Sequence, residues 1–193
     1  MRIHPLITLA AVLAVSIGLA TPAARAAPAA WTVDKAASRL GFKSSFSGMD
    51  FEASFRRWDA QIVFDPKALG ASSATVSIEP ASVATGDAER DGALPTADWF
   101  DVAQFPRASF VTKSMKSLGG DRYRADGVLT LRGQSRPVAL PFTLTIAGDV
   151  AKMTGEVAID RSAFGVGQGQ WSSAETVPLT VTVTVSITAH RAK

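Results

Sequence analysis

The most informative absence in this sequence is cysteine, which does not occur among its 193 residues. That excludes disulfide bonds, thiolate nucleophiles and cysteine-ligated metals, and it predicts a domain held together by packing alone. Histidine is almost as scarce, with only His4 and His190. We therefore do not expect a histidine-dependent triad or a metal site with several histidine ligands.

An excess of charge of one sign is lacking as well. The chain has 20 Lys and Arg residues against 17 Asp and Glu residues. Removing a leader that contains Arg2 and Arg25 leaves 18 basic residues against 17 acidic ones, a net charge of +1. A nearly neutral surface gives no reason to expect a nucleic-acid partner.

Recognisable catalytic motifs are missing too, because the chain has no G-x-S-x-G elbow and no phosphate-binding loop. Residues 165–169 carry alternate glycines, but no helix pattern follows them, which favours a flexible turn beside Trp171. Residues 87–98 match a calcium loop only in part, since Asp98 stands where a bidentate Glu is needed. We expect no enzyme, no catalytic residue and no metal site.

The features that are present begin with an amino-terminal export signal. Arg2 and His4 precede an uncharged apolar run over residues 6–20, and Ala24-Arg25-Ala26 supplies small residues for cleavage. The run is short for a bilayer span, which needs about 20 apolar residues. We predict a cleaved signal peptide over residues 1–26 and a single domain over residues 27–193, exported to the periplasm. A retained membrane anchor is the alternative.

Apolar and polar residues alternate along most of this domain. In the clearest case the apolar residues fall on one face and hydroxylated residues on the other. These apolar residues are Leu179, Val181, Val183, Val185 and Ile187. A period of two is typical of half-buried β-strands, and similar runs recur along the chain. We expect eight to ten short strands, the pattern of a β-sandwich or a β-barrel.

The alternation changes phase once, between Phe55 and Trp58. One extra residue at Arg56-Arg57 would restore the phase, so we predict a β-bulge or a sharp bend there. Helical signals are few. Thr96 is placed to cap a short helix over residues 97–102, and residues 86–94 are placed to form another turn.

Large aromatic residues cluster in the first two thirds of the domain. An eight-stranded barrel can be filled by its own side chains or can hold one small ligand, and both alternatives stay open at this point. A dry core is the default for each aromatic residue taken alone. If some of them line a cavity instead, its few charges suit a hydrocarbon chain.

Several stretches, taken in order, resemble the YceI-like, lipocalin-like family over nearly the whole domain. The stretches are Trp31-Thr32-Val33-Asp34, Ile62-Val63-Phe64-Asp65-Pro66, Ser82-Val83-Ala84-Thr85-Gly86, Arg90-Asp91, Asp98-Trp99-Phe100-Asp101-Val102, Gly127-Val128-Leu129-Thr130-Leu131-Arg132-Gly133 and Asp160-Arg161-Ser162-Ala163-Phe164-Gly165. Each stretch alone is weak, whereas their order and spacing together are specific. The chain departs from the commoner pattern at Ala37, where a His often precedes Ser38, so any ligand contact made by that His elsewhere is absent here.

The resemblance implies an all-β fold, an antiparallel eight-stranded lipocalin-like barrel with a short helical insertion and an elongated apolar tunnel. It implies a periplasmic protein that binds a polyisoprenoid or another long-chain amphiphilic lipid. The variants around Trp99-Phe100 and residues 165–171 resemble domains found beside membrane cytochromes of the b type. That suggests an isoprenoid quinone as the lipid, or a respiratory partner.

We therefore predict a binding protein whose barrel holds an isoprenoid lipid and has no other cofactor. The residues expected around the tail are Phe42, Phe46, Phe55, Trp58, Trp99, Phe110, Leu129, Phe142, Leu144, Phe164 and Trp171, and those expected near the head group are Arg132, Arg136 and Arg161. The alternative is a ligand-free module that docks a membrane cytochrome or a stress-response partner through residues 99–104 or 165–171. Whether the protein is a homodimer stays open.

Overall fold

A computed structural model describes residues 28–193, so the predicted signal peptide lies outside the described residues. Within residues 28–193, no helix combines the length and the apolar character needed to cross a membrane. The strands are β1 (Ala30–Val33), β2 (Arg39–Phe46), β3 (Met49–Phe55), β4 (Trp58–Val63), β5 (Ser73–Ile78), β6 (Val83–Ala84), β7 (Ala108–Gly119), β8 (Arg122–Leu131), β9 (Gln134–Ala147), β10 (Val150–Asp160) and β11 (Thr180–Arg191). The helix is α1 (Ala88–Ala93), and the 3-10 turns are η1 (Leu69–Ala71), η2 (Pro80–Ser82), η3 (Arg161–Phe164) and η4 (Gly169–Trp171).

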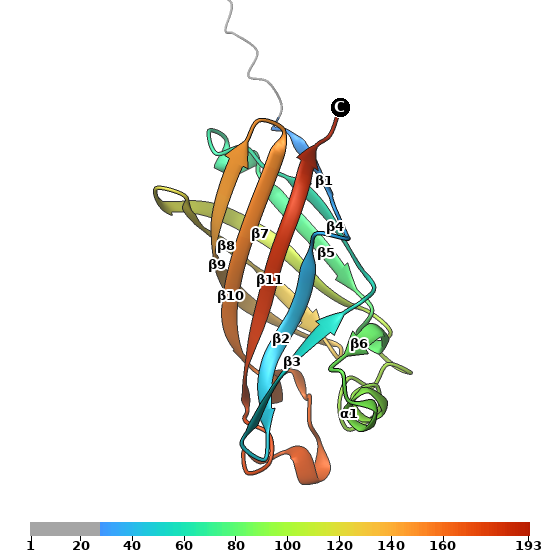
Figure 1. Cartoon of the computed structure of the whole chain (residues 1–193). Helices are drawn as coiled ribbons and strands as arrows, with labels where there is room; N and C mark the ends of the chain where they lie inside the picture. The colour runs from blue at the N-terminus through green and yellow to red at the C-terminus, as the bar shows by residue number, and fades with distance from the viewer. Residues whose placement is uncertain (1–27) are drawn as a thin grey trace, which may run out of the picture.

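The strands close into an antiparallel barrel (Figure 1). β11 pairs with β2 along its first half and with β1 at its end, so β1 and β2 share one position in the wall. β3 and β4 share the next position, since β2 pairs with β3 and β1 pairs with β4. Together with β5, β7, β8, β9, β10 and β11 they make eight positions, and β6 adds a short edge beside β3. The predicted eight-stranded antiparallel barrel with a short helical insertion is confirmed.

The alternating sequence pattern explains which side chains face the interior. In β11, Val181, Val183 and Val185 line the barrel, and the threonines between them fall on the outer face because successive side chains point to opposite sides of a strand. β11 is held in place by a ladder with β10 that runs from Val150↔His190 to Asp160↔Thr180. This long register makes the β10–β11 pair a rigid wall of the barrel.

The predicted bend at Arg56-Arg57 is confirmed, since β3 ends at Phe55 and β4 begins at Trp58. Ser82 holds the bend with its side chain and its backbone. The Arg57 amide donates a hydrogen bond to the Ser82 hydroxyl at 2.9 Å, and the Arg56 amide donates to the Ser82 carbonyl at 3.0 Å. Phe55 and Trp58 can therefore both face the interior although the strand changes phase between them.

The short helix lies at residues 88–93, within the segment expected to form a turn, and the helix predicted over residues 97–102 is wrong. Asp87 caps α1, because its carboxylate accepts a hydrogen bond from the Arg90 amide at 2.9 Å. Thr96 does not start a new helix. Its hydroxyl donates to the Ala93 carbonyl at 2.7 Å and so closes the end of α1.

Candidate functional site

Two cavities lie end to end inside the barrel. The first, here called the α1 cavity, has a volume of about 400 Å³ and is bordered by β2, β3, α1 and the residues around Trp99 and Trp171. The second, the β1 cavity, has a volume of about 170 Å³ and extends towards Trp31 on β1. The side chains that line both cavities are Leu40, Ile78, Leu129, Ile159 and Val183. Because these five residues border both spaces, the cavities form two parts of one elongated apolar lumen.

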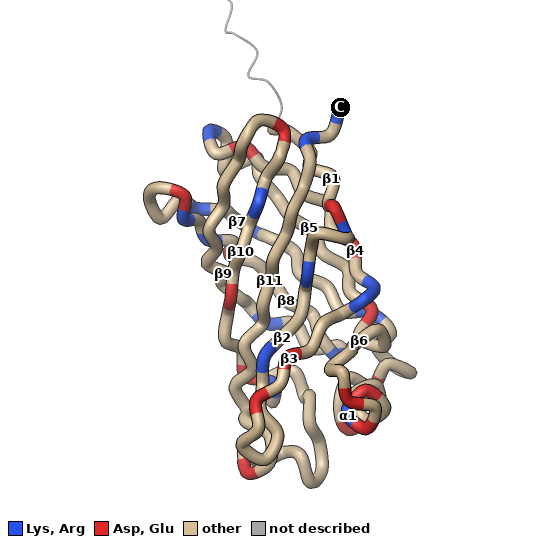
Figure 2. The backbone as a smooth tube through the Cα atoms, in the orientation of Figure 1, with Lys and Arg blue, Asp and Glu red and all other residues tan. Residues whose placement is uncertain are grey.

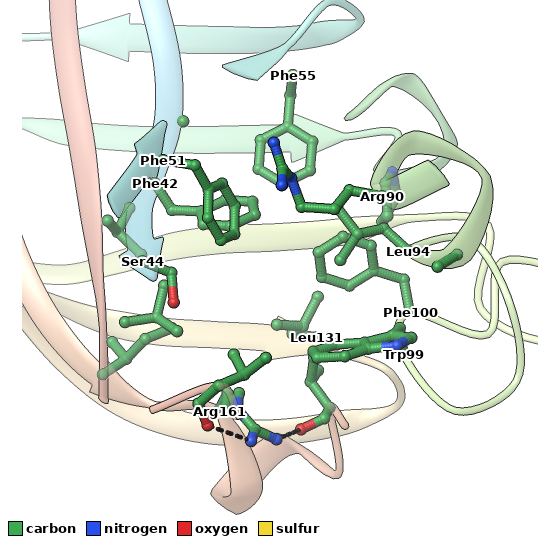
Figure 3. A pocket seen from close by; sticks show the side chains of 18 of the residues that line it. Phe42, Ser44, Phe51, Phe55, Arg90, Leu94, Trp99, Phe100, Leu131 and Arg161 are labelled. Carbon is green, nitrogen blue, oxygen red and sulfur yellow. Dashed lines mark hydrogen bonds between the residues drawn. The ribbon is translucent and has the colours of Figure 1, made fainter. Parts of the chain in front are cut away.

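Aromatic rings make up much of the α1 cavity wall (Figure 3). Phe42 packs edge-on against Phe51 with ring centroids 6.3 Å apart, and Phe55 lies 6.0 Å from Phe100. Trp171 lies 5.6 Å from Trp99. Aromatic pairs in such tilted or edge-on arrangements add about 0.5–1.5 kcal/mol beyond their buried area, so they hold the wall in place around the cavity.

The β1 cavity is lined almost entirely by apolar side chains, and Thr112 is its one hydroxyl-bearing residue among those described. At this end Phe64 packs edge-on against Tyr123 with ring centroids 5.4 Å apart. Trp31 is buried, and its indole N–H donates to the Phe64 carbonyl at 3.0 Å. A ligand group in this part of the lumen would meet almost no hydrogen-bonding partner, which suits a hydrocarbon tail.

The polar side chains of the lumen are gathered in the α1 cavity. Figure 3 shows the Ser44 hydroxyl directed into the cavity from one wall and Arg90 on another. The Arg90 guanidinium lies 4.7 Å from the Phe51 ring centroid and 3.7 Å from a carboxylate oxygen of Asp87. Ser44 Oγ and Arg90 Nε are buried and have no hydrogen-bond partner within the described chain. A buried polar atom without a partner is unusual in a folded protein, and both of these atoms belong to side chains that border the α1 cavity.

Arg161 also borders the α1 cavity, but its guanidinium is fully used by the protein. It is 3% exposed, and its five N–H groups donate to six backbone carbonyls. These carbonyls belong to Val166, Gly167, Trp171, Ser173, Val177 and Pro178. Burial lowers the pKa of Arg161, although the group stays charged at any physiological pH. Arg161 therefore shapes the loop between η3 and β11.

Gly167 is required by this arrangement. Its φ angle is +83°, and a Cβ atom at this position would lie 1.9 Å from a terminal guanidinium nitrogen of Arg161. The alternate glycines of residues 165–169 are thus part of a loop wrapped around a buried arginine. Sequence analysis treated the same residues as a flexible turn.

The structure places the predicted tail-binding residues in two groups and leaves one outside. Those that line the α1 cavity are Phe42, Phe46, Phe55, Trp99, Leu129 and Trp171, and those that line the β1 cavity are Trp58, Phe110, Leu129, Phe142 and Leu144. Phe164 is 2% exposed and packs in the cluster around the α1 cavity without bordering it.

The other two arginines predicted near the head group lie away from the lumen. Arg132 donates to the Ala97 carbonyl at 2.7 Å and lies 3.9 Å from the Asp101 carboxylate, so it holds the segment after α1. Arg136 is exposed and donates to the Ser135 carbonyl at 3.0 Å. Sequence analysis missed Ser44 and Arg90 as lumen residues. Arg90 was part of a motif quoted for the family resemblance, but nothing in the sequence indicated that α1 would direct it inward.

Ionisable side chains that could hold a metal do not gather in residues 28–193, where no group of three or more His, Asp or Glu residues is suitably placed. The chemistry available in the lumen is therefore apolar contact along its length and hydrogen bonding at the α1 end.

Comparisons with known proteins agree with this architecture. The model of the YceI-like domain family matches residues 31–189. A UPF0312 protein from Pseudomonas syringae pv. tomato is 31% identical over 179 residues, which cover 88% of this chain and 93% of that protein. The crystal structure of Burkholderia cenocepacia BcnA has a TM-score of 0.78 and 32% identity, covering 81% of this chain and 98% of BcnA.

A more distant structural neighbour shows the same fold. It is described as a polyisoprenoid-binding domain from Saccharophagus degradans implicated in plant cell wall breakdown. Its TM-score is 0.66 at 16% identity, and the match covers 86% of this chain and 99% of that domain. From the family match and the relatives above 30% identity, the chain belongs to the YceI-like domain family.

Proposed function

We propose that this chain is a periplasmic binding protein that holds one long-chain isoprenoid lipid in its lumen and catalyses no reaction. The observation that carries the proposal is the pair of apolar cavities that share Leu40, Ile78, Leu129, Ile159 and Val183. The Saccharophagus degradans neighbour, described as a polyisoprenoid-binding domain, supports an isoprenoid as the ligand.

The dimensions of the barrel suit an extended chain. β11 has 12 residues. At about 3.4 Å per residue and a tilt of about 40°, such a strand spans roughly 30 Å along the barrel axis. Each methylene buried in the lumen contributes about 0.8 kcal/mol, so binding strengthens with the length of the tail.

The distribution of polar groups orients the lipid. The tail lies in the β1 cavity, and the head group lies in the α1 cavity, where Ser44 and Arg90 have unpartnered polar atoms. Asp87 and Glu89 border the same cavity, while Arg161 is occupied by backbone carbonyls. This balance of charge favours a neutral head group with hydrogen-bond acceptors over a phosphate. The carbonyl oxygens of an isoprenoid quinone meet that requirement.

The alternative of a ligand-free docking module gains no specific support. Trp99 is 8% exposed and lies against Trp171, so the two rings border the α1 cavity and do not form a projecting apolar surface.

Native mass spectrometry of the protein, purified without detergent after export to a bacterial periplasm, tests the proposal. We expect a fraction of the protein to carry a lipid of defined mass that organic extraction identifies as an isoprenoid. An apo mass, with no uptake of offered isoprenoid quinone or isoprenoid alcohol, would overturn the proposal.

A blocking variant makes the test specific to the lumen. Val183→Trp places a large ring where the two cavities meet, and we expect it to reduce lipid retention at least about tenfold, because the ring would occupy the space through which the tail passes from one cavity to the other. Ser186→Trp is the matched control, since Ser186 is an exposed residue of the same strand. Equal lipid content in the two variants would contradict binding in the lumen.

A further inference from the structure

The barrel wall has an incomplete seam between the strand position of β1 and β2 and that of β3 and β4. The β1–β4 ladder pairs Ala30↔Val63 and Trp31↔Ile62, and the β2–β3 ladder begins at Gly41↔Ser54. Between these ladders, within the described chain, residues 32–40 and residues 55–61 face each other without a backbone rung. The bend at Arg56-Arg57 explains the gap, because it turns β3 towards β6 and away from β1.

Lys35 joins the two sides of this seam. Its ammonium group donates a hydrogen bond to the Trp58 carbonyl, lies 3.0 Å from the Asp59 carboxylate and sits 3.8 Å from the Trp58 ring centroid. These side-chain contacts replace the missing backbone ladder.

A polar cleft of about 520 Å³ lies over the seam and is separate from the lumen. Its charged lining residues are Lys35, Arg39, Arg56, Arg57, Asp59, Glu79 and Arg107. Five positive charges against two negative charges leave the cleft with a net charge of +3. Figure 2 shows basic segments on β2 and at the bend between β3 and β4, the elements that carry Arg39, Arg56 and Arg57.

The ion pairs of the cleft leave two arginines unused. Glu79 is paired with Arg57 at 2.6 Å and lies 3.8 Å from Arg107, and Lys35 is paired with Asp59. Arg39 and Arg56 are exposed, and neither forms an ion pair or a side-chain hydrogen bond within the described residues, although the charge of Arg56 helps to lower the pKa of Asp91. Guanidinium groups that line one cleft without an ion-pair partner suit an anion with several oxygens, above all a phosphate.

The cleft shares three apolar side chains with the lumen. Leu40 borders the cleft and both cavities, Phe55 borders the cleft and the α1 cavity, and Trp58 borders the cleft and the β1 cavity. These three apolar side chains therefore belong to the wall of the lumen and to the floor of the cleft.

We propose that the polar cleft is the surface with which the barrel docks on an anionic phospholipid bilayer, with lipid phosphates received between Arg39 and Arg56. The preference for a bilayer over a soluble anion rests on the proposed function, because a protein that takes up a membrane lipid has to meet the membrane. The cleft lies over the part of the seam that has no backbone ladder in residues 28–193, and it shares lining side chains with the lumen.

Co-sedimentation of the mature chain with vesicles tests the proposal. We expect binding to vesicles of phosphatidylcholine containing 30% phosphatidylglycerol and little binding to pure phosphatidylcholine vesicles. The double variant Arg39→Gln/Arg56→Gln should lower the partition coefficient about 10- to 30-fold, since each basic residue near an anionic surface contributes about fivefold.

Arg122→Gln/Lys152→Gln is the matched control, because it removes the same charge from exposed positions on β8 and β10, outside the cleft. We expect it to change the partition coefficient less than about threefold. Equal losses in the two double variants would overturn the cleft as the docking surface, as would failure of the unchanged protein to bind anionic vesicles. Displacement by millimolar phosphate beyond that caused by chloride at equal ionic strength would indicate a site for a soluble anion and overturn the bilayer assignment.

The lipid content of each variant, measured by native mass spectrometry, separates this proposal from the proposed function. Vesicle binding without a retained lipid would count against the lumen as a binding site. A retained lipid without vesicle binding would count against the docking surface alone.

Discussion

Arg161→Met should strongly destabilise the barrel, because it removes every donor that holds the loop between η3 and β11. Methionine keeps the apolar length of the arginine side chain but leaves six backbone carbonyls without their partner. A buried acceptor left unpaired costs about 1–3 kcal/mol, and water can reach part of this loop to replace some bonds. We expect a loss of about 3–5 kcal/mol in the free energy of unfolding, the range found when one member of a buried charged network is removed.

Urea and thermal unfolding followed by circular dichroism measure this loss. For a domain of this size, about 1 kcal/mol corresponds to about 2–4 °C in Tm, so Arg161→Met should lower Tm by about 6–20 °C. The Tm of Arg161→Lys should lie between that of the unchanged protein and that of Arg161→Met, because an ammonium group has three donors and no planar fork. Arg136→Met is the control, since Arg136 is exposed and its one hydrogen bond goes to the neighbouring Ser135 carbonyl.

We expect Arg136→Met to change the free energy of unfolding by less than about 0.5 kcal/mol. A loss below about 1 kcal/mol for Arg161→Met would refute the assignment of Arg161 as the residue that organises this loop. A loss equal to that of Arg136→Met would refute it as well.

Three further predictions concern single residues. Gly167→Ala should lower the free energy of unfolding by at least about 2 kcal/mol, because the backbone has a positive φ and the new Cβ meets the Arg161 guanidinium. Urea unfolding measures this loss, and an unchanged unfolding midpoint would contradict it. Hydrogen bonds from Thr85 lower the pKa of Asp91, so the carboxylate stabilises the fold above its unfolded pKa, near 3.8, and that contribution disappears as pH falls through the lower folded value. Asp91→Asn should therefore flatten the dependence of stability on pH in urea titrations between pH 6 and pH 2.5, and an unchanged acid slope would argue against this role. Ser44→Ala should reduce retention of an oxygen-bearing lipid about fivefold, because it removes one hydrogen bond of about 1 kcal/mol. Uptake of a plain hydrocarbon chain should stay the same. Equal losses for both ligands would contradict a head group at Ser44.

Local pattern was sufficient to predict the strands, their inner faces and the bend. A strand turns successive side chains to opposite sides, so the alternation of Val181, Val183 and Val185 with threonines is enough to predict which side chains face inward. The phase change between Phe55 and Trp58 predicted the break between β3 and β4 for the same reason. The family resemblance added the eight positions of the barrel wall, whereas the eight to ten strands expected from alternation fell short of the eleven that the structure has, because β1 with β2 and β3 with β4 each divide one position and β6 adds a short edge.

Tertiary structure alone decided what each arginine does and whether the barrel is filled. Arg132, Arg136 and Arg161 are the same residue type near predicted bends, yet one holds the segment after α1, one is exposed and one is buried among carbonyls. Arg90 enters the lumen because of the direction that α1 takes after its Asp87 cap. Nor does the order of residues show that the apolar faces leave a lumen between Leu40, Leu129 and Val183, because a cavity is the space left after distant strands have packed. The contacts of these arginines and the shape of the lumen depend on which residues far apart in the chain come together. The short-range alternation of apolar and polar residues does not contain that information.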